Sequence, residues 1–326
     1  MVLVLSKQEV LDLARMPALI EAVEAGLIEV SSGTAINPNR LRIFVPERSA
    51  MMACMPAYLG SSNALGAKIV SSSNRKLAPG EPRPMSALVL LADTDGRFLS
   101  VMYGTQLGAL RTAAASAVAI RHLALEEAST MAIIGCGVQG RAELAGALAV
   151  RPLSQIHIYD VDPATAQRFQ SEMTERYGVR ITVECSADAA VGQADIVALA
   201  TTSGTPVAAA SAYRPGTHIN AVGAHTPKTR ELDSDIVMRS RLYVESRGAI
   251  LAEAGDVLIP IDEGCITTAH ILGELGDVAA GTVEGRTAPT DITIFKSTGI
   301  AVEDVVAAKL IYEDALARGI GTVIEM

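Results

Sequence analysis

The sequence has few aromatic residues, few cysteines and no long apolar run. It has no tryptophan, four phenylalanines and seven tyrosines among 326 residues, so aromatics make up only 3%. Hydrophobic residues still reach 49%, with a mean hydropathy of +0.31. Alanine and valine therefore carry much of the apolar content, which suits closely packed α/β layers. This length predicts about two domains, at roughly 150 residues each.

The four cysteines give no sign of a disulfide framework or a metal site. They are far apart and form no C-x-x-C pair; they are Cys54, Cys136, Cys185 and Cys265. This usage is typical of reduced thiols in the cytoplasm, and no metal is expected. For Cys136, which lies in a glycine-rich turn, a small structural side chain is favoured over a reactive thiol.

Membrane and nucleic-acid partners are not expected. No apolar run approaches the ~18 to 20 residues that span a bilayer, and residues 1–5 are too short for a signal peptide. The formal net charge is −9, from 27 basic and 36 acidic residues, and no basic run is present. We therefore expect a cytoplasmic protein in which a few local cations would hold any small anionic substrate.

The most informative motif is the turn G-C-G-V-Q-G, with Gly135, Gly137 and Gly140. An apolar segment precedes it, a helix-like segment over 141–150 follows, and a second apolar segment ends in Asp160. Strand, turn, helix and acidic residue in this order are typical of a dinucleotide site, in which the phosphates bind at the helix N-terminus. A purely structural glycine turn is the alternative.

Asp160 also bears on the choice of cofactor. Its carboxylate can accept hydrogen bonds from the adenosine ribose and would repel a 2′-phosphate. No arginine directly follows it in D-V-D-P. We expect NAD(H) to be preferred, with NADP(H) as the alternative.

The pattern of apolar segments predicts two architectures. Before the glycine turn, strands in succession predict a mostly antiparallel sheet with a helix on it; the strands are 2–5, 41–45, 50–57, 64–70, 86–92 and 98–103, and the helix is 17–31. The turn signals between them are at 46–47, 60–63, 79–80 and 93–96. Because these strands carry long apolar runs, we expect a partner subunit to cover one face and the protein to be a homodimer. An ordinary core within one chain is the alternative.

From the glycine turn onward, strands and helices alternate. The expected strands are 131–134, 156–159, 181–184, 196–200, 218–222 and 242–244, which predicts a Rossmann-type, doubly wound parallel sheet. Long helices are expected at 107–125 and 301–317. The fold class is therefore α/β, with a second α+β domain.

Three cations and one histidine stand out as candidate site residues. Arg40, Lys68 and Arg111 interrupt apolar stretches, and a buried cation needs an anion, which a substrate carboxylate or an internal Asp or Glu could supply. His225 follows a strand that would end at the nucleotide-binding edge, where a histidine can exchange protons near neutral pH. A loop histidine with a local hydrogen bond is the alternative.

The chain resembles the ornithine cyclodeaminase/μ-crystallin family nearly end to end. The resemblance rests on M-P-A-Y-L at 55–59, G-A-K-I-V at 66–70, A-L-R-T-A-A-A-S-A at 109–117, the glycine turn, H-I-N-A-V-G at 218–223, G-E-L-G at 273–276 and I-F-K-S-T-G-I-A-V-E-D at 294–304. It implies a nucleotide-binding domain over 121–301. It also implies a substrate-binding and dimerisation domain built from 1–120 and 302–326.

The resemblance also implies roles for individual residues. Arg40, Lys68 and Arg111 would bind the substrate, chiefly its carboxylate, together with Thr298. The cofactor would contact Arg111, Thr112, the three glycines, Val138, Gln139, Asp160, Thr201, Asn220, Ala221, Val222 and Ser297. The catalytic roles follow from side-chain chemistry and not from the resemblance: Lys68 is expected to keep the imine nitrogen protonated, and His225 is a candidate proton relay to solvent.

One departure from the family pattern narrows the activity. His225 stands where cyclodeaminases and several dehydrogenases of the family carry an aspartate, which in cyclodeaminases helps handle the side-chain amine of the substrate. An imidazole is a poor partner for an ornithine ammonium, so reduction of a cyclic imino acid such as Δ1-pyrroline-2-carboxylate is favoured. The alternatives are an ornithine cyclodeaminase, an alanine dehydrogenase-type enzyme, or a crystallin-like protein that binds a nucleotide without turnover.

Overall fold

The computed structural model describes residues 1–73 and 84–325. The turn expected at 79–80 lies outside them. The chain forms two compact units, the first from Met1–Arg111 and Ile300–Met326 and the second from Thr112–Gly299. The domain division at 120/121 and 301/302, with its functional assignments, stays a proposal.

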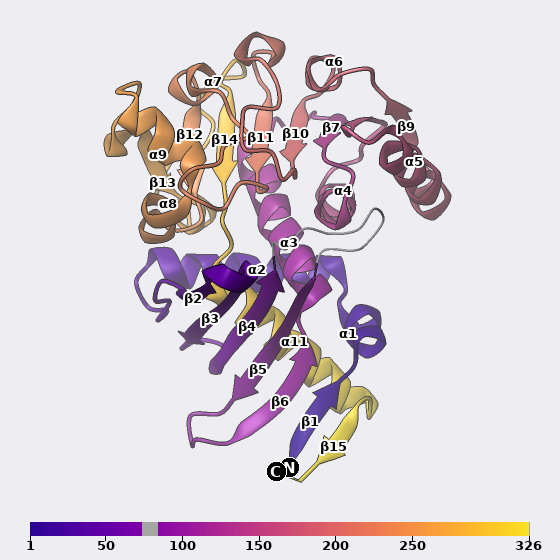
Figure 1. The fold of residues 1–326 in the computed structure, drawn as a ribbon, viewed down its shortest axis with the longest axis vertical. Coiled ribbons are helices and arrows are strands. Elements are labelled where there is room, and N and C mark those ends of the chain that lie inside the picture. Colours follow the sequence, from indigo (N-terminus) through magenta and orange to yellow (C-terminus); the bar gives the residue numbers. More distant parts are fainter. Residues whose placement is uncertain (74–83, 326) are drawn as a thin grey trace. The chain divides into compact units, whose positions relative to one another are not determined.

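In the described residues, unit 1 contains a seven-stranded sheet in the order β15-β1-β6-β5-β4-β3-β2 (Figure 1). Its pairs are antiparallel except for β1 with β6, which confirms the predicted mostly antiparallel sheet. The strands are β1 (Val2–Leu5), β2 (Leu41–Val45), β3 (Ala50–Leu59), β4 (Ala64–Ser73), β5 (Met85–Ala92), β6 (Phe98–Tyr103) and β15 (Thr322–Ile324).

A helix from the far end of the chain completes unit 1. α11 (Ala301–Arg318) packs against α2 (Met16–Ser31) and against strands β3, β4 and β5. Its buried face includes Val302, Val305 and Ile311, which supply the apolar surface that the sheet requires. The short elements α1 (Lys7–Leu13) and η1 (Pro46–Arg48) also belong to this unit.

Unit 2 is built on a parallel sheet, eight-stranded within the described residues, in the order β13-β12-β14-β11-β10-β7-β8-β9. The strands are β7 (Thr130–Ile134), β8 (Gln155–Tyr159), β9 (Arg180–Val183), β10 (Ile196–Leu199), β11 (His218–Ala221), β12 (Arg241–Val244), β13 (Ile271–Glu274) and β14 (Thr293–Lys296). The strand order reverses between β7 and β10, the point at which such sheets bind ligands at their carboxyl edge.

Helices connect the strands of this sheet (Figure 1). They are α4 (Val138–Val150), α5 (Pro163–Tyr177), α6 (Ala187–Val191), α7 (Ser234–Met238), α8 (Arg247–Glu253), α9 (Gly255–Asp262) and α10 (Leu275–Ala279), with η2 (Ala210–Ala212) and η3 (Thr268–His270). The unit boundary falls within α3 (Thr105–Leu123). The predicted mixed α/β fold with a parallel sheet is thereby confirmed.

The main differences from the sequence-based expectation concern short or polar elements. α4 starts at Val138 rather than 141, because Gly137 is its N-cap residue and the rest of the glycine motif already forms the first helical turn. Strands β13, β14 and β15 were not predicted. β14, T-I-F-K, has only two apolar side chains and ends in a lysine, so its local pattern is too weak to predict a strand.

Candidate functional site

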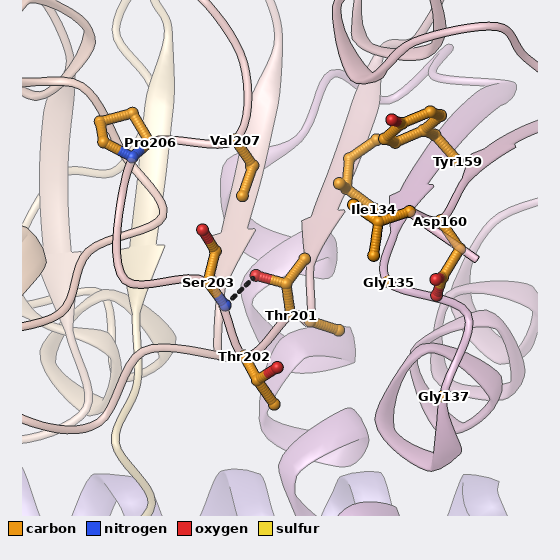
Figure 2. A pocket seen from close by; sticks show the side chains of 12 residues that line it. Ile134, Gly135, Gly137, Tyr159, Asp160, Thr201, Thr202, Ser203, Pro206 and Val207 are labelled. Atoms are coloured by element: carbon orange, nitrogen blue, oxygen red, sulfur yellow. Dashed lines mark hydrogen bonds between the residues drawn. The ribbon is translucent and has the colours of Figure 1, made fainter. Parts of the chain in front are cut away.

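A cavity of about 550 Å³ lies at the carboxyl edge of the unit 2 sheet. Residues that follow β7, β8 and β10 line it: Ile134, Gly135, Gly137, Tyr159, Asp160, Val161, Ala200, Thr201, Thr202, Ser203, Pro206 and Val207. Figure 2 shows Tyr159 and Asp160 on one side and Pro206 and Val207 on the other. The cavity therefore lies at the reversal of strand order, where the sequence predicts the nucleotide.

The glycine turn has the geometry that a pyrophosphate site needs. Gly135 has a φ of +97°, which disfavours any residue with a side chain. A Cβ on Gly140 would collide with the carbonyl oxygen of Gly135, whereas a Cβ on Gly137 would meet open space. The backbone is therefore bare where the phosphates would approach the N-terminus of α4.

Asp160 is fixed by backbone groups on either side. Its Oδ2 accepts a hydrogen bond from Cys136 N at 2.8 Å, and its Oδ1 accepts one from Asp162 N at 2.9 Å. The remaining lone pairs of the carboxylate suit the hydroxyls of a ribose. Burial raises the pKa of the Cys136 thiol to about 12, which supports the structural role expected for it.

Gln139 is oriented by a buried carboxyl group of the same helix. Its Nε2 donates to Oε1 of Glu143 at 2.7 Å, one helical turn away. Burial raises the pKa of Glu143 to about 7. Val138, beside it, is 61% exposed and available to a ligand at the helix N-terminus.

Buried carboxylates hold three further candidates, which follow the ends of β10 and β14: Thr201, Ser297 and Thr298. Oε1 of Glu231 accepts from both the N and the Oγ1 of Thr201, each at 2.7 Å. Glu245, directly after β12, accepts from Ser297 Oγ at 2.6 Å and from Thr298 N at 2.6 Å. Both carboxylates fix loops at the carboxyl edge of the sheet.

The β11 candidates differ in what they can offer a ligand. The Asn220 side chain is wholly buried, where its Oδ1 accepts from His218 Nε2 at 3.1 Å and its Nδ2 donates to Ser116 O at 3.3 Å. Burial lowers the pKa of His218 to about 3, so this ring is neutral. Ala221 ends β11 and Val222 follows it. The Ala221 carbonyl accepts from Ser297 N at 3.2 Å and from Lys296 Nζ at 3.1 Å, and Val222 N donates to Leu199 O at 3.0 Å.

In unit 1, the structure brings two of the cations onto one shared carboxylate, Asp304. Lys68 Nζ donates to Asp304 Oδ1 at 3.1 Å, and Arg111 Nε donates to the same oxygen at 3.0 Å. Arg111 also pairs with Glu303. The internal ion pairs that the sequence analysis left open are therefore present.

The environment of Lys68 is unusual for a lysine. The residue is 8% exposed, and burial lowers its pKa, with Asp304 opposing that shift and the charges of Arg111 and Arg40 adding to it. Arg40 is thus near enough to act on Lys68 electrostatically. Gly108 leaves room for the ammonium, because a Cβ there would lie 3.0 Å from Lys68 Nζ.

His225 is exposed, and its Nδ1 lies 2.9 Å from the carbonyl oxygen of Gly223. Since a carbonyl only accepts, Nδ1 carries the proton and Nε2 bears the lone pair in the neutral ring.

Thr112 is buried on α3. Across residues 1–73 and 84–325, no group of three or more His, Cys, Asp or Glu side chains could hold a metal ion.

Sequence reasoning missed the acidic partners. Glu303 and Asp304 interrupt the apolar segment A-V-E-D-V-V-A-A, and both are wholly buried. The criterion that selected the three cations, a charge inside an apolar stretch, would also have found these two acids. Glu245, directly after an apolar strand, carries a similar signal.

The fold and the cavity define a dinucleotide-binding α/β protein. Residues 1–319 match the profile of the ornithine cyclodeaminase/mu-crystallin family. The chain belongs to this family, as its sequence motifs indicated.

Named relatives support the same conclusion. The chain is 34% identical over 327 residues to a Delta(1)-pyrroline-2-carboxylate reductase of Bacillus cereus, with 99% of each chain covered. It is similar to the structure of Thermococcus litoralis Delta(1)-pyrroline-2-carboxylate reductase in complex with NADH and L-proline, with 40% identity, a TM-score of 0.95, and 99% and 100% of the two chains covered. An archaeal alanine dehydrogenase dimer with bound NAD shows 32% identity and a TM-score of 0.93, with 100% of this chain and 99% of that chain covered.

No helix in the described part of the chain combines the length and apolar character needed to cross a membrane.

Proposed function

We propose that the protein is an NAD(H)-dependent reductase that converts a cyclic imino acid of the Δ1-pyrroline-2-carboxylate type to the L-amino acid. The reaction adds a hydride to the imine carbon and a proton to the imine nitrogen. Two of the named relatives are Delta(1)-pyrroline-2-carboxylate reductases, and the structure of one of them is a complex with NADH and L-proline. The exposed imidazole at position 225, in place of an aspartate, favours imine reduction over ornithine cyclisation.

One observation about Lys68 carries the proposal. An ammonium has three N–H donors, and in the part of the chain that the structure describes, Asp304 is the hydrogen-bond acceptor of Lys68 Nζ. A buried ammonium with donors to spare is suited to a polar ligand. Arg111 and Arg40 add positive charge nearby, which favours a carboxylate.

Lys68 is also suited to handle the proton. Because burial lowers its pKa, the ammonium gives up a proton more readily than an exposed lysine does. We assign Lys68 the role of keeping the imine nitrogen protonated, which makes the imine carbon more electrophilic. His225, whose ring is exposed, is assigned proton exchange with solvent.

NADH, when bound, supplies the hydride. The bare backbone at Gly137, the N-terminus of α4 and the carboxylate of Asp160 would hold it, and Asp160 favours NAD(H) over NADP(H). Buried carboxylates already fix Thr201, Ser297 and Thr298. These residues therefore lose little conformational entropy when NADH binds.

We further propose that the protein is a cytoplasmic homodimer. All four cysteines are free, which suits a reducing compartment. The edge strand β2 exposes 67% of Leu41, 58% of Ile43 and 64% of Phe44, an apolar surface suited to a second copy of the chain. Light scattering on the purified protein and on a Phe44→Glu variant tests this: a dimer that becomes a monomer is expected, and a monomeric native protein would contradict it.

The decisive experiment measures NADH oxidation with pyrroline-2-carboxylate, piperideine-2-carboxylate, and pyruvate plus ammonia. Ammonia release from ornithine is followed in parallel. Turnover of a cyclic imine is the expected result. Greater turnover of pyruvate with ammonia, or of ornithine, would replace the proposal, and NADH binding without any turnover would favour a crystallin-like binding protein.

A further inference from the structure

The segment from the end of β11 to His225, residues 221–225, is held by two buried side chains, Glu231 and Lys296. Oε2 of Glu231 accepts hydrogen bonds from Gly223 N at 2.7 Å and Ala224 N at 3.0 Å. Its other oxygen holds Thr201, after β10. One wholly buried carboxylate therefore ties together two neighbouring loops at the carboxyl edge of the sheet.

The carbonyl groups of the same loop are held by a lysine. Nζ of Lys296, the last residue of β14, donates to Ala221 O at 3.1 Å and to Ala224 O at 2.6 Å. It also lies 2.8 Å from Asp256 Oδ2, and neither side chain is exposed. Asp256 Oδ1 in turn accepts from Glu231 N at 2.7 Å and Leu232 N at 2.9 Å. Glu231, Asp256 and Lys296 thus form one connected cluster, which we call the loop clamp.

The packing around the loop clamp leaves no room for a side chain at Gly223 or Gly255. A Cβ on Gly223 would collide with Thr201 O and lie 2.5 Å from Glu231 Oε1. A Cβ on Gly255, beside Asp256, would collide with Thr229 O. The loop clamp and the absence of a side chain at Gly223 therefore set the path of the loop together.

We propose that Glu231 and Lys296 are positioning residues that set the orientation and tautomer of His225. The inference rests on the proposed function for its catalytic meaning. His225 Nδ1 donates to Gly223 O, which belongs to the same peptide group as Ala224 N–H. Glu231 accepts from that N–H and from Gly223 N–H of the preceding peptide group. With Nδ1 protonated, Nε2 is the atom that exchanges a proton.

The number of donors calls for two accepting oxygens at 231, although burial and the charge of Asp256 raise the pKa of Glu231 and Lys296 opposes that shift. Three N–H groups and one hydroxyl converge on its two oxygens. A glutamine would turn an NH₂ group towards one pair of donors, so it could hold one loop but not both. Burying the ionisable groups of the loop clamp costs folding free energy. If Glu231 only filled space, a side chain of similar size could replace it without loss of function.

The test uses Glu231→Gln and Lys296→Met, with Asp195→Asn as the matched control. Asp195 Oδ2 also accepts two backbone N–H groups and a threonine hydroxyl, but at the opposite end of β10. The tautomer of His225 is read from ¹⁵N NMR of the ligand-free protein, with His225→Gln assigning the signal. Thermal stability, NADH affinity and kcat are measured beside it.

The native protein is expected to show the Nδ1–H tautomer. Both clamp variants should shift it towards Nε2–H and lower kcat by about 10- to 100-fold, with NADH affinity largely kept. Asp195→Asn should lose stability without changing tautomer or kcat. An Nε2–H tautomer in the native protein, or an unchanged tautomer in both clamp variants, would overturn the inference.

A double variant covers the case in which a single variant does not fold. Lys296→Met with Asp256→Asn removes both members of the ion pair, so it should recover stability while the hydrogen bonds to Ala221 O and Ala224 O stay lost. Recovery of the native tautomer in this double variant would contradict the inference. Because the NMR measurement needs no substrate, its outcome is separate from the proposed reductase activity: a protein that reduces no imine would still report on the clamp.

Discussion

Lys68 Nζ donates to Asp304 Oδ1 at 3.1 Å although the two residues are 236 positions apart in the sequence. The carboxylate shares this oxygen with Arg111, and the two cations outweigh burial to hold the pKa of Asp304 below its usual range. Burial lowers the pKa of Lys68, and an acid from α11 therefore opposes that shift in the lysine on β4 to which we assign the imine.

Replacing Asp304 by Asn should move the pH dependence of the reaction. Asp304 raises the pKa of Lys68, so its loss lowers that pKa further, and activity that needs the ammonium is lost at lower pH. The alkaline limb of kcat/KM should shift to lower pH. Removing one partner of a buried pair should also cost about 3–5 kcal/mol of stability. Asp314→Asn, in the same helix, is the control. An alkaline limb at the native pH in Asp304→Asn would contradict the role of Lys68 as the proton donor.

Changing Lys68 to Ala should reduce turnover far more than cofactor binding. We expect kcat to fall by about 10²- to 10⁴-fold, the usual range for a lost proton-transfer group. The NADH dissociation constant should hold, because every residue that lines the cavity belongs to unit 2. Stopped-flow rates and NADH fluorescence titration measure the two effects, with Lys309→Ala as control. A variant that turns over at the native rate would remove Lys68 from the mechanism.

Asp160→Asn should relax the cofactor preference. The amide keeps an acceptor for Cys136 N but no longer repels a 2′-phosphate. The ratio of kcat/KM for NADPH to that for NADH should rise by at least about tenfold, equivalent to ~1.4 kcal/mol. Asp162→Asn, two residues on and exposed, should leave the ratio unchanged. A native enzyme that prefers NADPH would refute the role given to Asp160.

The two glycines of the turn should fail in different ways. Gly140→Ala forces a Cβ into Gly135 O, so its Tm should fall together with NADH binding. Gly137→Ala has a φ of −78° and open space around the new methyl group, so its Tm should hold while NADH affinity drops. Calorimetry and titration of the pair decide this. Equal affinity in Gly137→Ala and the native protein would place the pyrophosphate elsewhere.

Glu143 should make stability depend on pH. Its pKa is raised by burial from 4.5 to about 7, so the folded protein binds the proton more tightly than the unfolded chain. The contribution of Glu143 to the free energy of unfolding is then fully present below about pH 4.5. It is lost as the pH rises to about 7, and the loss amounts to about 3 kcal/mol. Glu143→Gln keeps an acceptor for Gln139 and should flatten this slope in urea unfolding. The same slope in both proteins would assign it to other groups.

The sequence predicted those elements whose own pattern is strong. Apolar runs bounded by turn residues gave the strands of unit 1 within a few residues, and the glycine turn identified the cavity between β7, β8 and β10. β15 was missed because it is three residues long and exposed on every residue. α1 was missed although Ser6 and Glu9 form a capping box.

The partners of the candidate residues could not be predicted in the same way. That Lys68 needs an anion follows from its apolar neighbours, but which anion depends on where α11 packs. The loop clamp joins Glu231, Asp256 and Lys296 through three separate elements of the sheet edge. Such pairings depend on long-range topology, on which local periodicity carries no information.

The discontinuity of unit 1 has a consequence for synthesis on the ribosome. Residues 1–111 emerge first, but β1 lacks its neighbour β15, and Lys68 and Arg111 lack their carboxylates, until α11 follows. At ~5–20 residues per second, the interval lasts on the order of ten to forty seconds. The intervening residues carry a complete parallel sheet and can fold during that time. The nascent first unit therefore remains incomplete during that interval, with unpaired strand edges. The second unit, although later in sequence, is expected to reach its native state first.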